Sequence, residues 1–182
     1  KQLNCTVDEY RDHALAFRDV ARRGERETVD LLAAFGSDGC RAERSDAIQS
    51  TPFCFITGSG HQYFLDTVRQ LMDHVHADRV RAVLFEPWTY SDEGLSMRWD
   101  PSDDRRYALM DRDPTASDNK SRTVWMANLL AYRALVLVPC APRASGLVAT
   151  GWDNHGQQEV LTWPLWEFAA EPDTVRSMLQ QR

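Results

Sequence analysis

The sequence lacks most of the features that identify enzymes, metal proteins and membrane proteins. It has only four cysteines, at positions 5, 40, 54 and 140, and no two share the short spacing of zinc sites. No apolar run is long enough to span a membrane, and no signal-peptide pattern is present. We therefore expect a cytoplasmic protein without a disulfide framework, in which Cys54 and Cys140 are free and buried.

The sequence also has fewer basic residues than acidic ones. The 182 residues carry a formal net charge of −6 and a pI of about 5.3, which argues against a protein whose whole surface binds nucleic acid. A local basic patch is compatible with this balance. Six tryptophans are many for this length, and large aromatic side chains mark cores or contact surfaces.

Apolar periodicity predicts helices in the first part of the chain and strands in the later part. Helices are expected over 7–22, 28–35, 61–75, 77–85, 121–133 and 173–181. Short strands are expected over 52–56, 135–139, 146–150 and 159–163, with a hairpin-like loop over 151–156. The fold class is therefore α+β, with N-terminal helices followed by a short antiparallel or mixed sheet packed with helices. We expect a helical N-terminal segment, 1–50, and an α+β core domain, 51–182.

Two helices have clear predicted core faces, and one has a clear predicted cap. The 61–75 helix places six apolar residues together (Phe64, Leu65, Val68, Leu71, Met72 and Val75), and the 121–133 helix places four (Val124, Trp125, Leu129 and Leu130). Thr6 precedes acidic residues at the start of the first helix, which predicts an N-cap there.

The segment from Leu95 to Leu109 departs most from ordinary core patterning. Asp100-Pro101 cannot continue a helix, because proline lacks a backbone donor and pushes the preceding residue into an extended conformation. Ser102, Asp103 and Asp104 then supply turn-forming side chains. We expect two short strands joined by a tight, charged turn.

Basic and aromatic residues are densest around this turn. Arginine side chains bind phosphates in a bidentate manner, and aromatic rings stack on bases. Seven acidic neighbours nearly balance the positive charge, so a solvated, salt-bridged hairpin is an equally open interpretation. The basic group consists of Arg98, Arg105, Arg106, Arg112, Lys120, Arg122 and Arg133, with Trp99 and Tyr107 between them.

A second candidate for a phosphate contact is the sequence Thr57-Gly58-Ser59-Gly60. It lies between a predicted strand and a predicted helix, where backbone donors at a helix N-terminus meet anions. It has neither the lysine and spacing of a P-loop nor the glycine pattern of a dinucleotide site. A tight turn capped by Ser59 is the simpler interpretation, and a phosphate contact stays open beside it.

Metal chemistry has weak support in this sequence. His74 and His76 are two residues apart, whereas helical metal sites use a spacing of four. Asp100, Asp103 and Asp104 have the residue types of a metal-dependent nuclease, although the adjacent proline and arginines suit turn formation better. We predict no cofactor, no bound metal and no catalytic residue.

An ordered series of segments extends over about residues 50–180. They are Phe55–Leu65 (FITGSGHQYFL), Leu84–Trp88 (LFEPW), Met97–Pro101 (MRWDP), Arg105–Leu109 (RRYAL), Trp125–Ala131 (WMANLLA), Val138–Pro139 and Thr162–Trp166 (TWPLW). In this order and spacing they resemble the large-subunit family of the type I-U (also called I-G) CRISPR interference complex.

The resemblance implies an RNA-guided surveillance complex, in which guide pairing reads the target and the protein reads a short flanking motif. Such large subunits recruit a separate helicase-nuclease and cut nothing themselves. We therefore predict a non-catalytic subunit, not associated with a membrane, whose partners are other CRISPR subunits, guide RNA and target DNA. From side-chain chemistry, the predicted nucleic-acid contacts are Thr57, Ser59, Arg98, Trp99, Arg105, Arg106, Tyr107, Lys120 and Arg122.

Two alternatives from other functional classes stay open. The first is a stand-alone protein-interaction module that uses a tryptophan-rich surface. The second is a metal-dependent nuclease that uses Asp100, Asp103 and Asp104.

Overall fold

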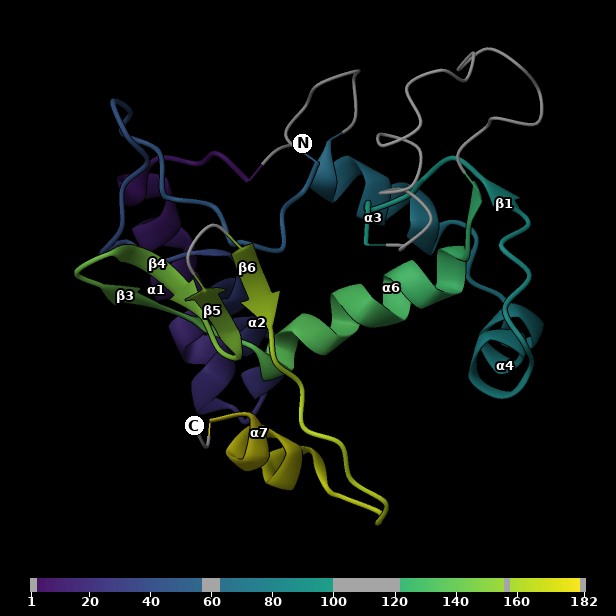
Figure 1. Ribbon diagram of the computed structural model, residues 1–182. Helices are drawn as coiled ribbons and strands as arrows, with labels where there is room; N and C mark the ends of the chain where they lie inside the picture. The colour runs from purple at the N-terminus through teal and green to yellow at the C-terminus, as the bar shows by residue number, and fades with distance from the viewer. Residues whose placement is uncertain (1–2, 57–62, 100–121, 156–157, 181–182) are drawn as a thin grey trace. The chain divides into compact units, whose positions relative to one another are not determined.

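The computed structural model describes residues 3–56, 63–99, 122–155 and 158–180 (Figure 1). Contacts divide the chain into two compact units. The central unit comprises Cys54–Tyr132, and the terminal unit combines Leu3–Phe53 with Arg133–Arg182. This division is interleaved along the chain, and the division into the segments 1–50 and 51–182 stays a prediction.

The predicted fold class is confirmed. Helices dominate the first half of the chain, and the described strands form three two-stranded antiparallel sheets. The helices are α1 (Val7–Arg22), α2 (Arg26–Phe35), α3 (Phe64–Met72), α4 (Ala77–Phe85), α6 (Trp125–Ala134) and α7 (Pro172–Gln180), with a 3₁₀ turn, η3, at Leu135–Leu137. The strands are β1 (Asp92–Glu93), β2 (Arg122–Thr123), β3 (Cys140–Arg143), β4 (Gly146–Ala149), β5 (Trp152–His155) and β6 (Gln158–Leu161).

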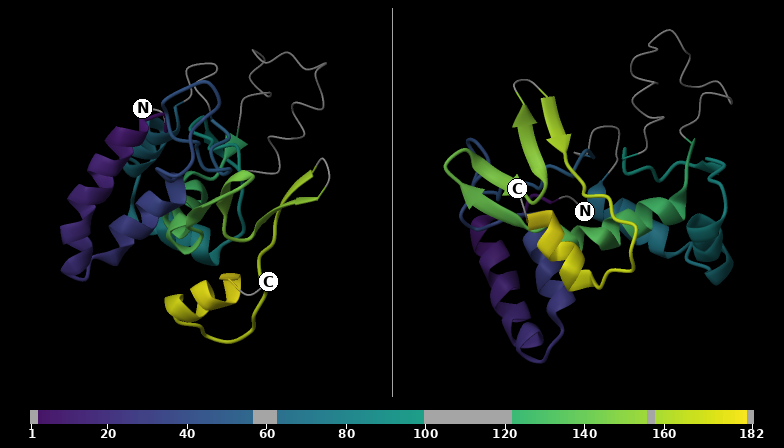
Figure 2. Two further views of the ribbon diagram at one scale, coloured as in Figure 1. Left: turned by 90° about the vertical axis from the view of Figure 1, so that its left-hand side faces the viewer. Right: turned by 60° about the horizontal axis from the view of Figure 1, so that its bottom comes forward.

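In the terminal unit, α1 begins at the predicted cap. The Thr6 hydroxyl accepts from the Glu9 backbone N–H at 3.2 Å, and the Glu9 carboxylate accepts from the Thr6 N–H at 2.7 Å. This capping box satisfies backbone donors that a helix start otherwise leaves without a partner. Helix α2 lies beside α1, as both views in Figure 2 show.

The core between these two helices is small and includes Val7, Tyr10 and Ile48. The chain leaves α2 through Gly36, where a Cβ atom would lie only 2.7 Å from Cδ1 of Ile48. A side chain at this position would therefore force the end of the buried Ile48 side chain to shift, so glycine is favoured here by close approach and not by a left-handed backbone. Helix α2 also contacts η3 and β3, which joins the N-terminal helices to the later hairpins.

Two predicted strands are wrong. Residues 52–53 form a turn and 54–56 have no regular structure, and Phe53 packs its ring edge-on against Trp152 at a centroid distance of 5.1 Å. Residues 135–139 begin with the 3₁₀ turn η3. An apolar run of this length fits a buried strand and a buried helical turn equally well, and here it continues directly from α6.

The strands predicted over 146–150 and 159–163 are present as β4 and β6, within two residues of the predicted bounds. Strand β4 pairs with β3, and the predicted loop at 151–156 contains strand β5, which pairs with β6.

All four cysteines are free, as expected. Cys54 and Cys140 are only half-buried, however, and burial raises the pKa of the Cys140 thiol to about 11.

In the central unit, α4 matches the predicted helix 77–85, whereas α3 is shorter than the predicted helix 61–75 and ends at Met72, before a turn. Helix α3 buries Phe64, Val68 and Leu71, whereas the predicted core residues Met72 and Val75 are exposed. Helix α4 ends at Phe85, because Glu86 is extended in front of Pro87.

The predicted core face of the 121–133 helix is wrong. Helix α6 buries Met126, Asn128 and Tyr132, and it leaves Leu130 exposed. The error has a physical cause. The buried Asn128 lies on the inner face of the helix and makes tertiary hydrogen bonds, and an analysis of hydrophobic periodicity counts asparagine as an exposed polar residue.

Candidate nucleic-acid interface

The segment from Tyr90 to Arg98 has an unusual backbone. Tyr90, Leu95 and Arg98 all adopt left-handed conformations, with φ angles of 50°, 52° and 59°. Such conformations cost roughly 1–3 kcal/mol for each non-glycine residue, and surrounding structure must hold them in place. Backbone strain of this kind is concentrated at binding and switch segments.

A buried asparagine holds the end of this segment. The Asn128 side chain, which is 3 % exposed, accepts a hydrogen bond from the Met97 backbone N–H at 3.1 Å. Its amide donates to the Thr123 hydroxyl at 2.6 Å and to the Val124 carbonyl at 3.1 Å. We call Met97, Thr123 and Asn128 the asparagine clamp. The clamp fixes the residues next to Arg98 and Arg122, and these two arginines bound the segment 99–121.

The described structure includes three of the predicted nucleic-acid contacts. Arg98 is half-buried, and its backbone N–H donates to the Ser96 hydroxyl at 2.9 Å. The Trp99 ring packs edge-on against Phe64, with centroids 6.0 Å apart. Arg122 is exposed on β2, opposite Glu93 on β1. The clamp therefore joins the backbone next to Arg98 to the residue next to Arg122 within the central unit, and Arg122 lies opposite the acidic Glu93 in the β1–β2 register.

The other predicted contacts fall outside the described residues, and their roles stay predictions. The predicted charged turn within 95–109 lies mostly outside the described residues. Its described part, 95–99, contains no strand. The carboxylates of the nuclease alternative are also outside. The residues concerned are Thr57, Ser59, Arg105, Arg106, Tyr107 and Lys120, together with Asp100, Asp103 and Asp104.

Sequence reasoning missed a second polar cluster, which is centred on Asp92. One carboxylate oxygen accepts from the Trp125 backbone N–H at 2.9 Å, at the start of α6, and the other accepts from the Arg79 guanidinium at 3.3 Å. The Arg79 guanidinium also lies 5.1 Å from the centre of the Trp125 ring, and the His74 ring lies 4.2 Å from that ring. Asp92 thus connects α4, β1 and α6.

Trp125 has a different role from the predicted one. It is half-buried among polar groups and does not belong to an apolar core, and its indole N–H donates to the Gly94 carbonyl at 3.0 Å. No local signal identifies Asp92 or Gly94 as its partners, because each is more than 30 residues away in sequence.

Within the described part of the chain, no three histidine, cysteine, aspartate or glutamate side chains gather closely enough to hold a metal ion. Among those same residues, no helix combines the length and the apolar character that crossing a bilayer requires. Comparison with protein-family models, with curated proteins and with solved structures gave no match to this chain. The resemblance to CRISPR large subunits therefore stays a prediction from sequence motifs.

Proposed function

We propose that this chain is a non-catalytic, nucleic-acid-binding subunit of an RNA-guided CRISPR surveillance complex, and that it contacts target DNA near the flanking motif. The observation that carries the proposal is the asparagine clamp, which holds the residues beside Arg98 and Arg122. The motif resemblance suggests the CRISPR complex as the setting. In this proposal the clamp holds Arg98 and Arg122 in position for DNA contact.

The chemistry of the clamp favours binding over a purely structural role. The strained backbone at Leu95 and Arg98 lowers the stability of the fold. Strain of this kind is found mainly where a binding function depends on the strained conformation. The residues next to the clamp are arginines, whose guanidinium groups contact phosphate oxygens or guanine edges in a bidentate manner. In this proposal Arg98 and Arg122 add to the contacts of Arg105 and Arg106.

The first test asks whether the chain belongs to such a complex. The tagged chain is purified from its native host at moderate salt, and any bound RNA is sequenced. Recovery of other CRISPR subunits with a repeat-derived guide RNA supports the proposal. Recovery of the chain alone, or with unrelated proteins and no RNA, contradicts the CRISPR assignment.

The second test addresses the arginines. The double variant Arg105→Ala/Arg106→Ala should weaken duplex DNA binding by the complex about tenfold or more, with an unchanged melting temperature. The matched control is Arg23→Ala/Arg143→Ala, which removes the same charge from exposed sites on the terminal unit. Equal losses in the two double variants would mean that only net charge matters, and would contradict a local site.

A second candidate function, a protein-interaction module, is favoured by one specific observation. The chain after β6 exposes large apolar side chains, including Leu165, which is 96 % exposed, and Phe168. The rings of Trp163 and Trp166 lie near each other here, with centroids 6.2 Å apart and planes tilted by 33°. Association with a protein partner that changes little with salt, without DNA binding, would favour this candidate over the first.

A further inference from the structure

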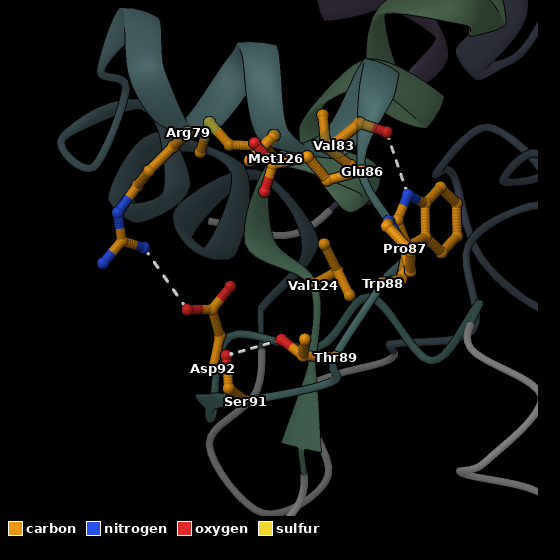
Figure 3. A pocket seen from close by; sticks show the side chains of 11 residues that line it. Arg79, Val83, Glu86, Pro87, Trp88, Thr89, Ser91, Asp92, Val124 and Met126 are labelled. Atoms are coloured by element: carbon orange, nitrogen blue, oxygen red, sulfur yellow. Dashed lines mark hydrogen bonds and ion pairs between the residues drawn. The ribbon is translucent and has the colours of Figure 1, made fainter.

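The central unit contains a pocket of about 250 Å³ between the end of α4, the segment that follows it and the start of α6. Figure 3 shows the ion pair between Arg79 and Asp92 on one side and Trp88 on the other. Val83, Val124 and Met126 contribute apolar lining. Small-molecule sites usually measure about 300–1,000 Å³, so this volume suits one amino-acid side chain better than a cofactor.

The charge of the lining favours a cation. One basic residue, Arg79, faces two acidic residues, Glu86 and Asp92. The positive charge of Arg79 already has partners within the protein. Its guanidinium forms an ion pair with Asp92 at 3.3 Å and lies 5.1 Å from the centre of the Trp125 ring. A phosphate would meet a net negative lining. The pocket therefore differs in chemistry from the proposed nucleic-acid contacts.

Two further features point to the same class of ligand. Ala82, Val83 and Glu86 line the pocket at the C-terminal end of α4, where the carbonyl ends of the helix favour positive charge. Trp88 is 51 % exposed, and its ring is held in place by a 2.9 Å hydrogen bond from the indole N–H to the Val83 carbonyl. Aromatic faces attract guanidinium groups, and more often those of arginine than the ammonium of lysine.

The surface beside the pocket indicates that the cation belongs to a protein. Leu84 and Phe85, the last two residues of α4, are exposed, and Phe85 has 80 % of its surface accessible. Exposed apolar side chains next to a small charged pocket are typical of a protein contact, in which one anchor residue fills the pocket.

We propose that this pocket is a docking site for an arginine side chain of a protein partner. The arginine stem lies against Val83 and Met126, its guanidinium reaches Glu86 and the Trp88 ring, and apolar residues of the partner cover Leu84 and Phe85. This inference does not depend on nucleic-acid binding by the chain.

The test uses the full chain and the capped peptide acetyl-Leu-Arg-Leu-amide. Binding is followed by NMR at the indole N–H of Trp88, which is assigned with the variant Trp88→Phe. We expect a dissociation constant on the order of 1 mM, as suits a contact with one side chain. The same peptide with citrulline, which has no charge, should bind at least fivefold more weakly. Equal binding of the citrulline peptide, or tighter binding of acetyl-Leu-Glu-Leu-amide, would overturn the proposal.

Matched variants then localise the contact. Glu86→Gln removes one charge with little change in shape and should weaken arginine-peptide binding at least threefold. Glu167→Gln makes the same change on an exposed residue of the terminal unit and should leave it unchanged. Equal effects of the two variants would overturn the assignment of Glu86. DNA affinity is measured on the same samples. Loss of the arginine-peptide effect contradicts only the pocket proposal, and absence of DNA binding contradicts only the nucleic-acid proposal.

Discussion

Tyr10 shows how one buried hydroxyl links distant parts of the terminal unit. Its oxygen lies 2.8 Å from the Gly36 carbonyl and 3.0 Å from the Leu32 carbonyl, and its single proton serves both. The residue is buried, and this burial, together with the nearby Cys140 and Asp38, raises the pKa of its phenol to about 12. Ionisation would place a negative charge against two carbonyl oxygens.

Stability should therefore fall at high pH through Tyr10. Because the pKa is raised in the folded state above the ordinary value of 10, the contribution is fully present below pH 10. It is lost as the pH rises from about 10 through 12. We expect a loss on the order of 1–2 kcal/mol, measured by urea unfolding at a series of pH values.

Tyr10→Phe provides the comparison for this effect. At pH 8 the variant should be less stable than the natural chain by about 1–2 kcal/mol, because the buried Gly36 carbonyl loses its donor. The difference between the two proteins should shrink above pH 10, where only one of them has a phenol at this position to ionise. A constant difference across this range would mean that another group causes the alkaline loss.

At the scale of elements, the cap of α1 acts through local contacts alone. Thr6→Ala removes the acceptor for the Glu9 N–H and should cost about 1 kcal/mol in unfolding free energy. Thr6→Ser retains a hydroxyl and should stay within a few tenths of a kcal/mol of the natural chain. Thermal or urea unfolding separates the two, and equal losses would assign the effect to the threonine methyl group.

The asparagine clamp joins β2, α6 and the loop at Met97, so its loss should affect both stability and binding. Asn128→Ala removes the acceptor of the Met97 N–H and the amide that donates to the Thr123 hydroxyl, and we expect a loss of about 2–3 kcal/mol. If the clamp positions Arg98 and Arg122, DNA affinity should fall even at temperatures where the variant is fully folded. The control Asn4→Ala changes an exposed asparagine and should alter neither quantity. Unchanged DNA affinity in folded Asn128→Ala would leave the clamp a purely structural role.

At the scale of the whole molecule, a net charge of −6 requires any DNA contact to be local. The slope of the logarithm of affinity against the logarithm of salt concentration reports the number of phosphates contacted, at about −0.9 for each. We expect a shallow slope of about −2 to −4, which fits a few arginines. Arg122→Ala should make the slope less negative by about one, and a slope near −10 would indicate an extensive basic surface instead.

The sequence predicts elements well where the signal is local. The Thr6 cap, helix α4 with its end before Pro87, and the strand beginning at Gly146 all depend on neighbours within a few residues. The failures have the opposite character. The run at 135–139 looks like a buried strand, yet it continues from α6 as a 3₁₀ turn, because its environment is set by packing and not by its own composition.

For the candidate site, side-chain chemistry selected Arg98, Trp99 and Arg122, and their role as nucleic-acid contacts stays a prediction. The sequence by itself determined the α+β class, the main helices and the acidic balance, since these follow from composition and short-range periodicity. Only the tertiary structure decided that Asn128 holds Met97 and that Asp92 holds Trp125, which are partners 31 and 33 residues apart. Buried polar groups must find hydrogen-bond partners wherever the fold places them, and no pattern of neighbouring residues encodes which partners those are.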